Sequence, residues 1–341
     1  MILAFLASWA PFKIDALGLI TILGTTELDM TVGSLVRNRL TDFLPLLAAF
    51  LIAGNNILSP IPGFAVYNIT DGILATDVSG WLARWLLCQD FTWNSTELRL
   101  QLLLDIGRRN RFQRRLSEVA LGVLGISTLL VFPILTADWF GLANSLSMTA
   151  SVFVRWAVVS QNRNAIDRDT LAGLESSSEV IKTFWTLPTG KAVAMYVPRG
   201  VLIGCFLTTP QPPSPLFYSA ARMAGWVAFG CHIITLGMTS LFNQLVTVFV
   251  LIAATFLTSR RIGADNSHIA SHLAINRFDH PDPHDSRTSA YVRLNLSYTE
   301  ERKLLAWNLV PHESNQEWWQ KYRTLLGKER ESYRSHRAHT I

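Results

Sequence analysis

The sequence has little charge and none of the common catalytic signatures. Charged residues make up 16% of its 341 residues, whereas about 25% is typical of soluble domains. It contains no P-loop, no dinucleotide-binding glycine fingerprint, no G-x-S-x-G and no H-E-x-x-H motif. The three cysteines, Cys88, Cys205 and Cys231, form no C-x-x-C pair and are odd in number, so we expect no disulfide framework. The sequence predicts no cofactor.

The composition favours a membrane protein instead. Hydrophobic residues make up 49% of the chain and there are 11 tryptophans, a residue that favours the bilayer interface. The mean hydropathy is +0.25. The net charge of +5 comes from residues placed mainly between the apolar runs, a pattern that fits loops beside anionic lipid better than a nucleic-acid surface.

The longest apolar stretch is Phe217–Thr258, in which Arg222 is the one charged residue. A spanning helix needs about 20 apolar residues, so the stretch has room for two spans, with a turn at Thr235–Thr239. The pair Arg260 and Arg261 follows directly. Because arginines concentrate on the cytoplasmic side of membranes, we predict a helical hairpin with both ends in the cytosol.

A second hairpin is predicted over residues 116–159. Leu116–Leu135 forms the first span, Thr136–Trp139 the turn, and Phe140–Val159 the return. The return is rich in small residues, which let helices approach closely in lipid. Arg155 lies about a turn from its end and is expected to snorkel outward.

The N-terminal part offers one or two further spans. Ile2–Gly24 is long enough to cross a bilayer, but Pro11, Lys13 and Asp15 lie near its middle. It is either a kinked span in contact with protein or two short interfacial pieces. Phe43–Leu58 is expected to span. No cleavable signal peptide is expected, since a basic n-region and a cleavage site are missing.

A basic segment precedes the second hairpin. Apolar residues recur at helical spacing over Ser95–Phe112, which predicts an amphipathic helix on the anionic cytoplasmic leaflet. The alternative is a solvated basic loop. Anionic lipid headgroups are the predicted partners of its arginines, Arg108, Arg109, Arg111, Arg114 and Arg115.

A polar insertion separates the two hairpins. It contains three short runs of β-branched and aromatic residues, Val180–Leu187, Ala192–Val197 and Val201–Thr208. Turn-forming Pro-Thr-Gly and Pro-Arg-Gly segments separate them. We predict a small β-meander rather than an additional spanning helix, because another crossing would place Arg260 and Arg261 outside the cytosol.

The tail carries two capping boxes and most of the histidines. Ser297 with Glu300, and Ser314 with Glu317, each match the S-x-x-E pattern that begins a helix. The H-x3-H spacing would place two imidazoles on one helix face, as in membrane-bound di-iron enzymes. The candidate metal ligands are His268, His272, His280 and His284. The alternative is a solvated polar linker.

Polar residues inside the predicted spans are candidates for function by default. They are His232, Asn243, Gln244 and Asn144. The alternative for all four is hydrogen bonding between helices. A transport path would require a water-accessible cavity that reaches His232.

Part of the sequence resembles a family. The segments that carry the likeness are Ser160–Asp167, Ala224–Met238 and Leu294–Trp319, within roughly residues 105–325. They are similar to uncharacterised filamentous-fungal polytopic integral membrane proteins. The resemblance implies a membrane topology and a link to secondary metabolism, and it implies no catalytic residue.

These observations predict an all-α membrane protein of four transmembrane helices in two helical hairpins, plus one or two N-terminal spans, with a small cytosolic α+β portion. Both termini are expected in the cytosol. The protein itself is expected in an endomembrane or in the plasma membrane. The leading hypothesis is a non-enzymatic scaffold or accessory protein. The alternatives are a small-molecule transport component and a membrane enzyme that uses the tail histidines. The expected segments are residues 1–58, 59–115, 116–159, 160–215, 216–258 and 259–341.

Overall fold

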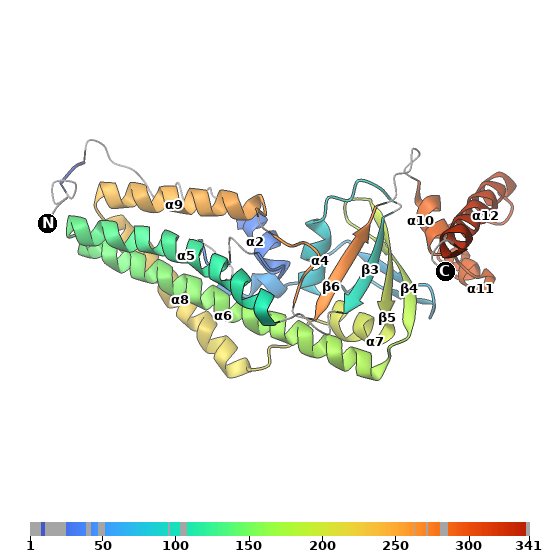
Figure 1. Cartoon of the computed structure of the whole chain (residues 1–341), viewed down its shortest axis with the longest axis horizontal. Helices are drawn as coiled ribbons and strands as arrows, with labels where there is room; N and C mark the ends of the chain where they lie inside the picture. Colours follow the sequence, from blue (N-terminus) through green and yellow to red (C-terminus); the bar gives the residue numbers. More distant parts are fainter. Residues whose placement is uncertain are drawn as a thin grey trace.

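The computed structural model describes residues 8–10, 25–38, 42–46, 52–94, 96–102, 108–262, 264–270, 272–279 and 286–338, of which 25, 102, 108–121, 330 and 332–338 are described by their backbone alone. The molecule is elongated (Figure 1), with a bundle of helices at one end, a β-sheet in the middle and three further helices at the other end. We call the bundle the arm, and the sheet with the helices on its two faces the body.

Four long helices form the arm. Helices α5 and α6 are joined by a short turn in which the Asp138 carboxylate accepts a hydrogen bond from the Gly141 N–H at 2.9 Å, which caps α6. Helices α8 and α9 are joined at Thr239 and Ser240. Helix α6 has 38 residues and continues beyond the arm to the sheet (Figure 1). The bounds are Arg108–Thr136 for α5, Trp139–Ser176 for α6, Pro215–Met238 for α8 and Leu241–Ser259 for α9.

The body contains a six-stranded sheet in the order β2-β1-β4-β5-β3-β6. Neighbouring strands are antiparallel except β3 and β5, which are parallel. The strands come from three separated parts of the chain. Their bounds are Ala65–Asn68 for β1, Ile73–Ala75 for β2, Glu97–Leu102 for β3, Val180–Thr186 for β4, Ala192–Pro198 for β5 and Leu273–Phe278 for β6.

Helices cover the sheet on both faces. Because successive side chains of a strand point to opposite faces, Trp185 of β4 packs in one core and its neighbour Phe184 in the other. The first core lies under α4 (Gly80–Leu87), the end of α6, the one-turn helix α7 (Arg199–Val201) and the π-helix η3 (Leu202–Phe206).

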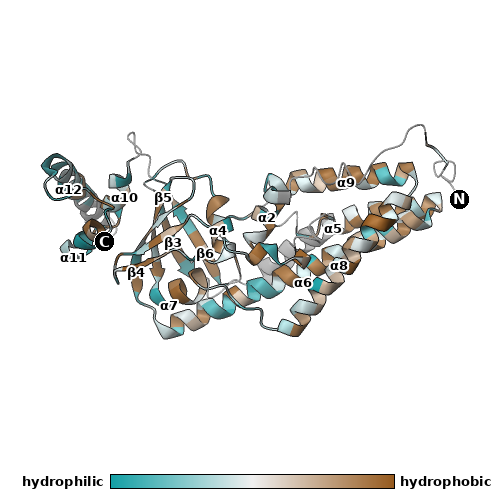
Figure 2. Cartoon of the chain, turned by 180° about the vertical axis from the view of Figure 1, so that it is seen from behind, coloured by the Kyte–Doolittle hydropathy of each residue, from teal (hydrophilic) through white to brown (hydrophobic). Residues whose placement is uncertain are grey.

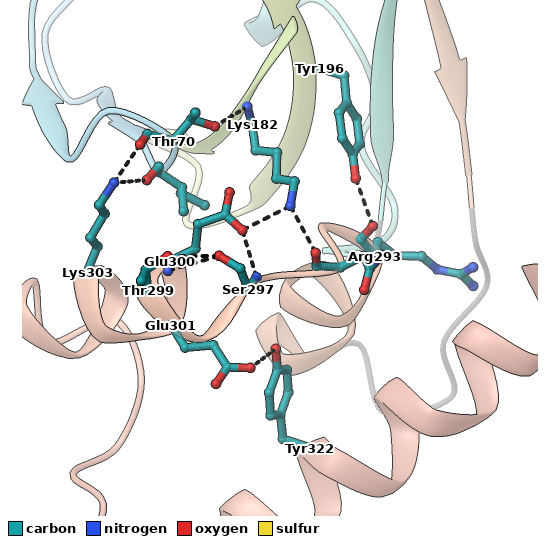
Figure 3. A network of polar contacts seen from close by, with 12 residues as sticks. Thr70, Lys182, Tyr196, Arg293, Ser297, Thr299, Glu300, Glu301, Lys303 and Tyr322 are labelled. Atoms are coloured by element: carbon teal, nitrogen blue, oxygen red, sulfur yellow. Dashed lines mark hydrogen bonds and ion pairs between the residues drawn. The ribbon is translucent and has the colours of Figure 1, made fainter.

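The second core lies under the C-terminal helices α10 (Arg287–Arg293), α11 (Tyr298–Ala306) and α12 (Gln316–Ala338). A polar network ties them to the sheet (Figure 3): the Lys182 ammonium donates to the Glu300 carboxylate at 2.9 Å. Glu300 also completes a capping box with Ser297. Burial raises the pKa of Glu300, but the hydrogen bonds from Ser297 and Lys182 outweigh it and leave the pKa below 4.5.

Two short helices, α2 (Thr25–Gly33) and η2 (Asn56–Leu58), lie between the arm and α4. The buried Arg84 of α4 holds them together, since its guanidinium pairs with Asp29 at 2.9 Å and donates to the Asn56 carbonyl at 2.6 Å. An arginine with several acceptors can link elements that share little apolar surface.

The predicted all-α membrane fold with four transmembrane helices in two hairpins is wrong. The chain is mixed α/β, with a six-stranded sheet. Within the described residues, two helices, α6 and α9, are long and apolar enough to cross a membrane. The prediction failed because the sheet pairs β1, β3 and β6 with strands far away in the sequence, and such pairing leaves no local pattern.

Several local predictions can be compared with the structure. The strands at Val180 and Ala192, and the helices after Ser297 and Ser314, are confirmed. The predicted helix Ser95–Phe112 is wrong in its first half, which is strand β3. The predicted strand Val201–Thr208 is wrong, because η3 occupies most of it. Nearly all of Ile2–Gly24 lies outside the described residues, as does the middle of Phe43–Leu58.

Candidate functional site

Large apolar side chains cover the outside of the arm. Leu216 is 89% exposed and Phe249 is 73% exposed. In Figure 2, hydrophobic residues recur along the ribbons of α8 and α9. Other apolar side chains exposed on α6, α8 and α9 are Phe153, Trp226, Val227, Ile234, Ile252 and Phe256. In the body, by contrast, Trp81, Trp85 and Trp185 are fully buried. An apolar surface of this extent marks a contact with lipid or with another protein.

The two ends of the arm differ in charge. At its far end, which we call the tip, Asp138 is the charged residue in the turn between α5 and α6. At the end next to the body, which we call the base, five arginines gather within or just after helices α6, α8 and α9. They are Arg155, Arg163, Arg222, Arg260 and Arg261. Helix α9 between tip and base has no charged residue.

A polar contact lies inside the arm. The His232 ring of α8 and the Asn144 side chain of α6 meet at 2.6 Å between Nδ1 and Oδ1. Because the amide oxygen only accepts, His232 Nδ1 carries the proton. Asn144 in turn donates to the Thr247 hydroxyl of α9 at 3.3 Å. His232 is 4% exposed, and its Nε2 has no hydrogen-bond partner among the described residues.

Two of the four predicted intramembrane residues therefore lie together, and the other two do not join them. The Asn243 amide donates to the Asp138 carboxylate at 2.9 Å, at the tip. The Gln244 amide donates to the carbonyls of Leu236 and Thr239, at the end of α8. The Asn243 bond joins the two turns at the tip, and the Gln244 bonds satisfy carbonyls at the end of α8. The His232 contact is a buried interhelical hydrogen bond, and transport stays a hypothesis.

Of the predicted tail histidines, His268 and His272 are not on a helix. His268 forms an isolated β-bridge with Ala274, and its Nδ1 contacts the Asp265 carboxylate at 2.9 Å. His272 immediately precedes strand β6, and its backbone N–H donates to Asp167. His280 and His284 lie outside the described residues. Within the described part of the chain, no group of three or more His, Cys, Asp or Glu side chains could hold a metal ion.

The predicted lipid-binding arginines stand at the start of α5. The backbone of Arg108, Arg109, Arg111, Arg114 and Arg115 is helical. Only the backbone of these residues is described, so contact of their side chains with anionic headgroups stays a prediction.

Two arginines at the base, the buried Arg155 and the half-buried Arg163, were not predicted as site residues. Arg155 was expected to snorkel outward; instead it is 5% exposed and donates to the backbone carbonyls of Asp42 and Leu44 at 2.8 and 2.6 Å. Arg163 pairs with the Asp42 carboxylate at 2.9 Å. The spacing of the two arginines, eight residues apart on one helix, places them on one face and could have indicated a shared site.

No family model, curated protein or solved structure matches this chain. The resemblance to filamentous-fungal membrane proteins thus stays an expectation from the sequence.

Proposed function

We propose that the arm is inserted in a lipid bilayer and that the protein is a non-enzymatic accessory protein that holds its α/β body at the membrane surface. The observation that carries the proposal is the set of large apolar side chains exposed along α6, α8 and α9 (Figure 2). In water, each such side chain forgoes about 1.5–3 kcal/mol of burial free energy. Lipid would cover this surface without a partner protein.

The dimensions of the arm support the proposal. Helix α9 has 19 residues, which gives a length of about 28 Å, close to the hydrocarbon thickness of about 30 Å. Asn144, His232 and Thr247 bond to one another rather than to lipid, as polar groups in an apolar solvent must.

The charges support one orientation. The arginines gather at the base and leave the tip with Asp138. Positive residues favour the cytoplasmic side, so the base and the body face the cytosol. The continuity of helix α6 supports an accessory role. This helix runs without a break from the tip into the core of the body (Figure 1) and holds the arm and the body together.

The free thiol of Cys231 tests the proposal. Cys231 is exposed on α8 within the arm. In a full-length protein with Cys88 and Cys205 replaced by serine, it should resist a polyethylene-glycol maleimide in sealed cytosol-side-out membrane vesicles. It should react once SDS is added, because lipid no longer covers it.

A matched control carries the single thiol on the body. Glu175→Cys, in a protein that also has Cys231→Ser, places a thiol at an exposed position of α6 and should react in the intact vesicles. If Cys231 reacts in intact vesicles as fast as the control thiol at position 175 does, the proposal is overturned. Protection of both would overturn the orientation.

A further inference from the structure

A cleft lies between helices α11 and α12, at the end of the molecule opposite the arm (Figure 1). Its volume is about 270 Å³. Its walls come from α11, from the loop that precedes α12 and from α12 itself. The side chains that matter for its chemistry are Tyr298, Glu301, Arg302, Glu313, Trp319 and Arg323.

Each of the two helices brings an aromatic ring and an arginine to this cleft with the same spacing. Residues four apart are neighbours on one face of a helix, so Arg302 lies over Tyr298 in α11 and Arg323 lies over Trp319 in α12. The guanidinium carbon of Arg302 is 6.0 Å from the centre of the Tyr298 ring. That of Arg323 is 5.6 Å from the centre of the Trp319 ring. A guanidinium that a ring already holds in place loses less side-chain freedom on binding.

The two arginines differ in what they bind. Arg323 donates to both carboxylate oxygens of Glu301, at 2.7 and 2.6 Å, which is the forked pairing of a guanidinium with a carboxylate. Arg302 donates to the neutral Tyr298 hydroxyl at 3.3 Å, and it forms no ion pair with any residue that the structure describes. Arg302 therefore repeats the arrangement of Arg323 without the carboxylate.

A carboxylate without a donor lines the same cleft. Glu313 is exposed in the loop before α12, and within the described part of the chain its carboxylate accepts no hydrogen bond. Its charge attracts Arg302, but the two side chains form no ion pair. The cleft thus presents one cation and one anion that are each ready to bind an opposite charge.

These two charges are complementary to a second copy of the same surface. In a dimer with a two-fold axis the same patch of both copies meets, so each residue contacts its counterpart's partner and the reverse. Arg302 would bind Glu313 of the partner subunit, and this pairing would occur twice. Tyr298, which is 65% exposed, and Trp319 would surround the ion pairs; tryptophan, tyrosine and arginine are the residue types that contribute most to binding in interfaces. We propose that the protein forms a two-fold dimer through this cleft.

The test measures the mass of the full-length protein by sedimentation equilibrium in a neutral, density-matched detergent over a range of protein concentrations. The unaltered protein should dimerise. Arg302→Glu and Glu313→Arg each replace two attractive pairs by two repulsive ones. Each should raise the dissociation constant of the dimer about a hundredfold or more, at about tenfold or more per pair. Both positions are exposed, so the fold should tolerate either change.

Two further samples make the test specific. Lys321→Glu makes the same change of charge as Arg302→Glu at an exposed position of α12 outside the cleft, and it should leave dimerisation unchanged. In a mixture of Arg302→Glu with Glu313→Arg, one chain has glutamate at both positions and the other has arginine at both. Every pair across the axis is then attractive again, so the mixture should dimerise although neither variant does so alone.

Several results would overturn the proposal. The first is an unaltered protein that stays monomeric at every concentration, which would leave the cleft to a different partner. The second is a dimer that Arg302→Glu weakens no more than Lys321→Glu does, since the arm would then hold the two copies together. The third is a mixture of the two variants that stays monomeric. If a variant does not fold, the salt dependence of the unaltered dimer replaces it: surface ion pairs are screened by salt, and a dissociation constant that high salt leaves unchanged would refute the pairing.

The dimer does not depend on the proposed insertion of the arm. Protection of Cys231 is measured in membrane vesicles, and dimerisation is measured in detergent. A reactive Cys231 together with a dimer that both charge reversals weaken would refute the inserted arm alone. A protected Cys231 in a monomeric protein would refute the dimer alone.

Discussion

Replacing Gly200 by alanine should loosen the contact that fastens helix α6 to the body. The backbones of Gly173 in α6 and Gly200 in α7 touch each other. A Cβ atom at Gly200 would lie 1.8 Å from the Gly173 carbonyl oxygen and 2.5 Å from the Ser176 hydroxyl. The obstacle is backbone rather than the far end of a side chain, so it cannot rotate away.

The size of the effect follows from this geometry. Overpacking usually destabilises a fold by about 1–3 kcal/mol, and a clash with backbone belongs at the upper end of that range. A loss of about 3 kcal/mol lowers the Tm of a unit of this size by about 6–12 °C. Trp81, Trp85 and Trp185 are buried in the adjoining core, so the change in tryptophan emission on heating reports the unfolding of the body.

Gly204→Ala provides the matched control in the same segment. A Cβ at Gly204 would meet only the Asp169 carbonyl oxygen, at 3.8 Å, an ordinary contact. Its Tm should stay within about 4 °C of the unaltered protein, since alanine is favoured over glycine in helices by at most about 1 kcal/mol. If Gly200→Ala melts as late as Gly204→Ala, the close approach of α6 and α7 is refuted.

Two further predictions concern polar contacts. The hydrogen bond from Arg199, 2.5 Å from the carboxylate, holds the pKa of Asp71 below its ordinary value of 3.8; the pair therefore stabilises the fold above pH 3.8, and that stability is lost as the pH falls through the lowered pKa. Between pH 5 and pH 3 the Tm of Asp71→Asn should thus fall less than that of the unaltered protein, and equal slopes would contradict the assignment. In the arm, a double-mutant cycle of Asn144→Leu and His232→Leu should give a coupling free energy of about 0.6–1.7 kcal/mol in reversible unfolding in mixed detergent. A coupling free energy of zero would contradict a hydrogen bond between the two side chains.

The features that the sequence predicted correctly are those set by neighbouring residues. Strands β4 and β5 flank a turn in which Gly190 has a φ of +82°, a conformation that favours glycine. Helix α11 begins at the capping box of Ser297 and Glu300. Each signal lies within a few residues, so no tertiary context was needed to read it.

Strand β3 shows what was missed although a signal was present. In Glu97–Leu102, leucines alternate with Glu97, Arg99 and Gln101, which is the period of two expected of a strand. The basic residues that follow favoured an amphipathic helix in its place. The pairing of β3 with β5 and β6 could not be predicted, because it joins residues about a hundred or more positions apart.

The candidate site divides in the same way. His232 and Asn144 stood out because a polar residue in an apolar run needs a partner, and the two do meet. The side chain of Arg155 was predicted to point outward, because snorkelling is the usual behaviour of an arginine near a helix end. Its acceptors, the carbonyls of Asp42 and Leu44, come from more than a hundred residues earlier in the chain. Only the fold reveals that they are there.

Helix α6 links three parts of the molecule: the arm, the base and the body. Asn144 lies in its first turns, Arg155 about 16 Å further on and Gly173 about 27 Å beyond that, at a rise of 1.5 Å per residue. The first meets His232 inside the arm, the second donates to the carbonyls of Asp42 and Leu44 at the base, and the third fastens the body. If the arm is inserted in a bilayer as proposed, the continuity of α6 also sets the height of the body above the membrane.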